Sequence, residues 1–117
     1  MEIRTSYAEG QDGICIVEVN GRIAADTITQ LEDALTAVLE GGSTRIVVDL
    51  GDVGYISSAG LRVFLSTLKS TKANNGVLVL ANLNSNVAKV FKLAGFTKIF
   101  TIMDDVPKAV QSIRASE

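Results

Sequence analysis

Two adjacent serines, Ser57 and Ser58, are the residues of this 117-residue sequence whose type and setting could carry chemistry. They lie in the stretch YISSAGLRVFL, between an apolar pair and the start of an amphipathic helical pattern. A serine hydroxyl can act as a nucleophile, accept a phosphoryl group or cap a helix. Nucleophilic attack needs a general base. The sequence has no histidine and no pattern that places a lysine beside the pair, so an activated serine hydrolase is not favoured.

Other chemically capable residues give no second candidate site. Cys15 is the only cysteine and lies in the apolar run ICIV, which predicts a small buried hydrophobe. One cysteine and no histidine exclude the usual zinc sites and histidine-based triads. Asp49 and Asp52 lack a third ligand or a nearby base, and no phosphate-binding GxxxxGK[ST] or GxGxxG motif is present. We therefore expect no metal, no cofactor and no enzymatic activity.

The residues around the serine pair leave two interpretations open. Serine is a strong N-cap, and replacing such a cap with alanine costs about 1 kcal/mol, so capping is the favoured interpretation from local chemistry. The free N–H groups and the positive dipole end of a helix start also suit a phosphate. The small Ala59 and Gly60 leave the approach to the serines open. Glycine costs about 1 kcal/mol of helix propensity relative to alanine, so Gly60 indicates either close approach of a partner or tight helix–sheet packing.

The elements that must position these serines alternate along the chain in the order ββαβαβαβα. Strands are predicted at 3–8, 14–19, 45–50, 77–81 and 98–102, and helices at about 26–40, 58–73, 85–94 and from 104 or 105 onward. Asp26 is predicted to cap the first helix, with Thr27 and Gln30 at capping-box spacing, and Ser85 is predicted to cap the third. Asp104 or Asp105 is predicted to start the last helix, with Pro107 in its first turn.

This order predicts an α/β domain with a mostly parallel open sheet of about five strands and four helices, joined by right-handed crossovers. The first strand is expected to be antiparallel, at one edge. The loops 20–25, 51–58 and 82–85 then meet outside the carboxyl ends of the strands, where functional groups gather in such sheets. The length fits one domain over residues 1–117.

Composition limits the partner classes. The net charge is −2, aromatic residues make up 5% of the chain, and no basic stripe is present, so neither nucleic acid nor an anionic membrane surface is an expected partner. The N-terminal residues lack the apolar core of a secretory signal, and no apolar stretch approaches the ~18 residues of a membrane span. We expect a soluble cytoplasmic protein.

Three motifs in the right order resemble one family over nearly the whole chain. The segment DVGYISSAGLRVFL resembles the signature of the STAS domain, specifically that of stand-alone bacterial anti-sigma factor antagonists. The segment VNGRI at 19–23 resembles the family's GxLD turn. The segments SNVAKVF at 85–91 and LAGFTKIF at 93–100 resemble its SPxVxxxFxxxGLxxIF ending.

The resemblance implies a phosphorylation switch with the STAS fold. In this family, an anti-sigma factor with the histidine-kinase-like ATPase fold is the kinase that phosphorylates the STAS protein. The unphosphorylated STAS protein binds this anti-sigma factor, and a sigma factor is thereby released. A serine phosphatase resets the switch. The implied phosphorylation site is Ser58, with Ser57 as the second choice. Ser57 replaces the family's acidic residue before the phosphorylated position, and Ala24 replaces an aspartate of the turn.

The resemblance also implies a partner surface, made of Gly21, Arg22, Ala24, Ile56, Ser57, Ser58, Ala59, Gly60, Arg62, Leu83 and Asn84. A phosphate adds about −1.5 to −2 charges to this small and apolar patch. Arg62 is either a partner contact, a neutralising group or a solvated helix residue. Two other functions stay open: a constitutive STAS assembly subunit in a stressosome-like scaffold or a lipid-transport complex, and a small-ligand or nucleotide-binding domain with a pocket at the strand ends.

Overall fold

The computed structural model describes residues 1–10 and 12–116, and within them it confirms the predicted element order. The sheet strands are β1 Glu2–Tyr7, β2 Cys15–Asn20, β3 Arg45–Asp52, β4 Val77–Ala81 and β5 Thr101–Met103. The helices are α1 Ile28–Glu40, α2 Ser58–Ala73, α3 Ser85–Leu93 and α4 Val106–Ala115, with a short 3-10 helix η1 at Phe96–Lys98. The strands lie in the order β1-β2-β3-β4-β5. As predicted, β1 is antiparallel to β2 at one edge and the other pairs are parallel.

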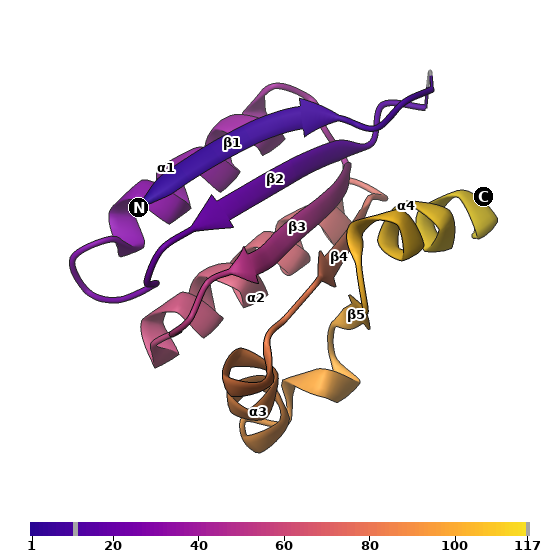
Figure 1. Cartoon of the computed structure of the whole chain (residues 1–117). Coiled ribbons are helices and arrows are strands. Elements are labelled where there is room, and N and C mark those ends of the chain that lie inside the picture. Colours follow the sequence, from indigo (N-terminus) through magenta and orange to yellow (C-terminus); the bar gives the residue numbers. More distant parts are fainter. Residues whose placement is uncertain (11, 117) are drawn as a thin grey trace.

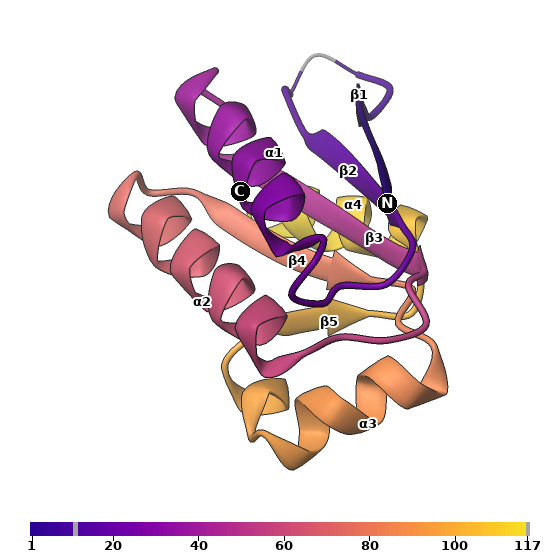
Figure 2. The same ribbon diagram turned by 90° about the vertical axis from the view of Figure 1, so that its left-hand side faces the viewer.

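Helices cover both faces of the sheet, α1 and α2 on one side and α4 on the other (Figures 1 and 2). Side chains alternate between the faces along each strand. In β3, Ile46 and Val48 belong to the core under α1 and α2, whereas Val47 packs in a second core with Ile113 of α4. A strand buried on both faces explains the near-continuous apolar run at 45–50.

The predicted strand at 98–102 is displaced toward the C-terminus. Phe96–Lys98 form η1 instead, and β5 begins at Thr101. Gly95 adopts a left-handed backbone with φ 77°, which ends α3 and starts the tight turn. The turn lets Phe96 and Phe100 pack around Phe91, with ring centroids 6.3 and 5.8 Å from that of Phe91. Aromatic packing therefore overrides the local strand preference.

Two predicted helix caps are wrong, and one is confirmed. The N-cap of α1 is Thr27 rather than Asp26, and its hydroxyl makes no capping bond because its oxygen accepts from the Ala24 N–H at 3.0 Å, outside the helix, while its O–H donates to the Arg22 carbonyl at 2.6 Å. The N-cap of α3 is Asn84, one residue before Ser85, and its side chain accepts from the Val87 N–H. Asp105 caps α4, as one of the two predicted positions.

Candidate functional site

The two serines at the start of α2 have different structural roles. Ser57 is the N-cap, with extended backbone, and its Oγ accepts a hydrogen bond from the Gly60 N–H at 3.2 Å. Ser58 is the first helical residue and is exposed. Among the hydrogen bonds of the described residues, none involves the Ser58 hydroxyl. One serine therefore builds the helix start, and the other presents its hydroxyl to solvent there.

Backbone hydrogen bonds between two loops support this helix start. The Gly21 N–H donates to the Asp52 carbonyl at 3.1 Å, and the Ile23 N–H donates to the Tyr55 carbonyl at 2.9 Å. The Ser57 N–H then donates to the Ile23 carbonyl at 2.9 Å. Figure 2 shows both loops, between β2 and α1 and between β3 and α2, at the same end of the sheet. The serine pair thus rests on a hydrogen-bonded base.

Packing below the serines explains Gly60. A Cβ on Gly60 would lie 2.5 Å from the Cγ2 of Ile23 and 2.8 Å from the Cγ1 of Ile56. Both isoleucines are buried, and Ile56 is only 3% exposed. Of the two explanations that the sequence left open, tight packing is the one the structure provides, because α2 can approach the two loops this closely only without a side chain at Gly60.

The third loop contributes a scaffold residue and a surface residue. The Asn84 amide donates to the Val53 carbonyl, while its Oδ1 accepts from the Val87 N–H at 3.0 Å. Asn84 therefore connects the start of α3 to the loop before α2. Its neighbour Leu83 is half-buried and contributes to the surface. Asp49 also has a structural role, because its Oδ1 accepts from the Gly51 N–H and from the Asn82 amide.

Tyr55 is a surface residue of the site that sequence reasoning omitted. It is 48% exposed, and the guanidinium carbon of Arg22 lies 5.2 Å from the centre of its ring. This is the geometry of a cation–π contact. The sequence could have indicated Tyr55, because it is an aromatic residue directly after Gly54, in a loop at the carboxyl end of a strand. Binding residues concentrate in such loops.

The eleven residues expected at the partner surface differ in exposure. Arg22, Ser58 and Arg62 are exposed. The half-buried members are Gly21, Ala24, Ser57, Ala59, Leu83 and Asn84. Ile56 and Gly60 are buried. The loops and the start of α2 bring these residues to one end of the sheet, but Ile56 and Gly60 support the surface from below rather than forming it.

Among residues 1–10 and 12–116, no cluster of three or more histidine, cysteine, aspartate or glutamate side chains is arranged to hold a metal ion. The helices of this part of the chain include none that is both long and apolar enough to cross a membrane. Cys15 is buried, as predicted, with 2% of its surface exposed. Burial raises the pKa of its thiol, and a hydrogen bond with the Ser43 side chain partly offsets this by lowering the pKa.

Comparison with known proteins finds a family model and several relatives that this chain resembles. The family model for the STAS domain matches residues 6–109. The Bordetella bronchiseptica protein BtrV, named as an anti-sigma factor antagonist, is 37% identical over 105 residues, which cover 90% of each chain. A Thermotoga maritima structure named as an anti-sigma factor antagonist superposes with a TM-score of 0.88 at 24% identity, covering 96% of this chain and 94% of that one.

A third similar protein, SpoIIAA of Bacillus, has been solved in two states. Its unphosphorylated form, named as an anti-sigma factor antagonist, superposes with a TM-score of 0.72 at 18% identity, covering 97% of this chain and 98% of that one. Its phosphorylated form gives the same TM-score at 16% identity, covering 99% of this chain and 100% of that one. Both states share the fold of this chain.

Proposed function

Because this chain belongs to the STAS domain family and its relatives are named anti-sigma factor antagonists, we propose that it is the phosphorylation-controlled component of a partner switch. In this proposal the unphosphorylated protein binds an anti-sigma factor that is also a serine kinase, and a sigma factor is released. Phosphorylation of Ser58 blocks binding, and a serine phosphatase restores it. The observation that carries the proposal is the division between Ser57, whose hydroxyl caps α2, and Ser58, whose hydroxyl is exposed.

The position of Ser58 supports a phosphate without a change of fold. Ser58 is the first residue of the sixteen-residue α2, where the helix dipole and the free N–H groups favour negative charge. The Ser57 side chain engages only the Gly60 N–H of this turn. The phosphate therefore changes the surface and leaves the helix start intact.

The surface around Ser58 supports a large effect on binding. Ala59 and Leu83 are half-buried, and Tyr55 is 48% exposed, so a partner lying flush on this surface would remove water from the phosphate. An added dianion that is not paired in the complex costs several kcal/mol. A cost of about 2.7 kcal/mol already weakens binding about 100-fold.

Phosphate mapping tests the assignment of Ser58. The wild-type protein, Ser57→Ala and Ser58→Ala are each incubated with ATP and each kinase of the histidine-kinase-like ATPase fold from the same genome. We expect one of these kinases to place one phosphate on Ser58 in the wild type and in Ser57→Ala, and none on Ser58→Ala, as read by mass spectrometry of peptides.

A phosphate that moves to Ser57, or that persists in Ser58→Ala, would contradict the assignment. If no kinase modifies the chain and a stable complex with other proteins survives Ser58→Asp, the constitutive assembly subunit becomes the better account. That outcome would remove the switch but not the family membership.

A further inference from the structure

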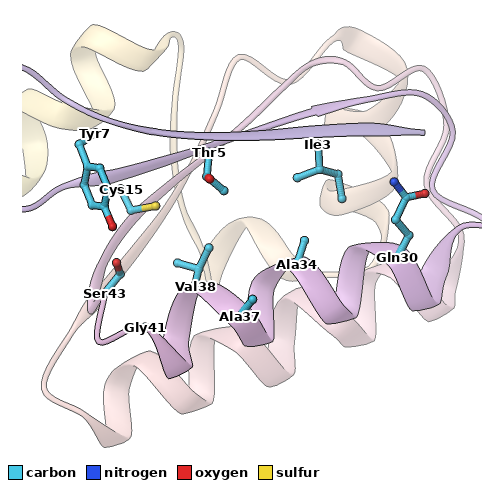
Figure 3. A pocket seen from close by; sticks show the side chains of 10 residues that line it. All are labelled: Ile3, Thr5, Tyr7, Cys15, Gln30, Ala34, Ala37, Val38, Gly41 and Ser43. Carbon is cyan, nitrogen blue, oxygen red and sulfur yellow. The ribbon is translucent and has the colours of Figure 1, made fainter.

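A cavity of about 430 Å³ lies between the edge strand β1 and helix α1 (Figure 3). Ile3, Thr5 and Tyr7 form one wall, because alternate residues of β1 face the same side. Cys15 of β2 contributes to its lining and is buried. The volume is in the range of small-molecule sites, about 300–1,000 Å³. We call this cavity the β1–α1 groove.

Small residues of α1 and of its C-cap keep the β1–α1 groove open. Ala34, Ala37 and Gly41 line the helix side, at spacings of three and four residues that bring them to one face. Ala37 is exposed and Ala34 is half-buried, so neither is fully covered by another part of the described chain. The opposite wall is also incompletely covered, because Tyr7 is 67% exposed.

Polar side chains gather at the two ends of the groove, and the middle is lined mostly by apolar side chains, with the Thr5 hydroxyl as the exception. Figure 3 shows Tyr7 and Ser43 near Cys15 at one end and Gln30 at the other, with Ile3, Ala34 and Val38 between them. Gln30 and Val38 are separated by about 12 Å along the helix axis, at about 1.5 Å per residue. The groove is therefore elongated, with hydrogen-bonding side chains at its ends.

None of the described residues that line the groove carries a charge. An ionised ligand group would lose water there without gaining an ion-pair partner, which is costly. The lining therefore favours an uncharged molecule with an apolar chain and a terminal group able to hydrogen-bond.

We propose that the β1–α1 groove is a binding site for a neutral amphiphile with an alkyl or acyl chain, separate from the Ser58 surface. The chain lies between Ile3 and Ala34, and the polar head meets the hydroxyls of Tyr7 and Ser43, because the Gln30 amide at the other end already donates to the Met1 carbonyl at 2.9 Å. The proposal does not depend on the phosphorylation switch, since it concerns a different surface of the domain.

The test is an NMR titration of the whole chain with monodecanoylglycerol below its micelle concentration. We expect saturable shifts confined to amides around the groove, such as those of Thr5, Cys15 and Ala34. Decanoate, which has a charged head on the same acyl length, is expected to bind at least 10-fold more weakly at pH 8. Shifts spread over the whole domain, or equal affinity for decanoate, would overturn the proposal.

Variants separate the groove from general surface binding. Ala34→Leu fills the groove and is expected to weaken monodecanoylglycerol at least 10-fold. Ala37→Leu makes the same test at an exposed position that does not disturb the core. Ala73→Leu is the matched control, because it adds a leucine at the exposed end of α2. Equal weakening by the control would overturn the proposal. So would shifts along β1 that depend on protein concentration without any probe, because a second copy would then occupy the groove.

Discussion

At the start of α2, Gly60 is small because Ile23 and Ile56 fill the space around it, whereas Ala34 and Ala37 of α1 border a cavity of about 430 Å³. In the first region a missing side chain lets two segments touch. In the second, short side chains leave two segments apart. The sequence pattern looks similar in both places, so the meaning of a small residue depends on what lies opposite it.

Replacing Gly60 should give the largest change in stability. We expect Gly60→Ala to lower the free energy of unfolding by about 1–3 kcal/mol, because the new Cβ meets two buried isoleucines and overpacked sites cost this much. Urea unfolding followed by circular dichroism measures the change. A variant as stable as the wild type would show that the helix start can shift at little cost, and would weaken the contrast with α1.

Removing the cap should have a smaller effect. We expect Ser57→Ala to destabilise the protein by about 1 kcal/mol, because the Gly60 N–H loses its side-chain acceptor. Ser58→Ala is the matched control and should change stability by less than about 0.5 kcal/mol, as exposed substitutions usually do. If Ser58→Ala loses more stability than Ser57→Ala in the same urea experiment, the roles assigned to the two serines are wrong.

Filling the β1–α1 groove at Ala37 should leave the stability of the protein almost unchanged. We expect Ala37→Leu to alter the free energy of unfolding by less than about 0.5 kcal/mol, because the position is exposed and the groove has room for the added atoms. A loss comparable with that of Gly60→Ala would mean that the groove closes in solution.

The tie between the β1–β2 turn and α4 should add a small, pH-dependent effect. The Arg114 Nε donates to Asp12 Oδ2 at 2.6 Å, and this hydrogen bond holds the pKa of Asp12 below its usual range. A lowered carboxyl pKa stabilises the fold above the ordinary pKa, and the benefit disappears as pH falls through the folded-state value. We therefore expect the difference in urea midpoint between wild type and Asp12→Asn to shrink from pH 7 to pH 2. A difference independent of pH would contradict the role of the charge.

The periodic patterns of the sequence predict most of this fold. The β-branched run at 45–50 and the heptad-like spacing of Leu61, Phe64 and Leu68 correctly indicate a central strand and α2. The chain departs from these patterns where particular side-chain partners decide: the Thr27 hydroxyl accepts from the Ala24 N–H instead of capping α1, and Phe96 turns into η1 to pack against Phe91. These partners lie only a few residues away along the chain, but apolar periodicity does not show which hydroxyl or ring each of them will contact.

The sequence predicts which loops form the candidate site, but it does not predict the different roles of the two serines within it. The sequence places Ser57 and Ser58 together and cannot say which hydroxyl is engaged, because that depends on the backbone angles of the helix start. Burial of Ile56 and exposure of Tyr55 likewise follow from the hydrogen bonds between two loops. The β1–α1 groove has no sequence motif at all, since it arises from the distance between a strand and a helix.

Calorimetric titration of the partner kinase with Ser58→Asp, Ser58→Ala and the wild type tests the central claim most directly. Ser66→Asp is the control, because it puts the same charge at an exposed position further along α2. We expect Ser58→Asp to bind at least about 100-fold more weakly, which corresponds to about 2.7 kcal/mol, and Ser58→Ala and Ser66→Asp to bind within a few-fold of the wild type. Binding of Ser58→Asp as tight as that of the wild type would contradict the account.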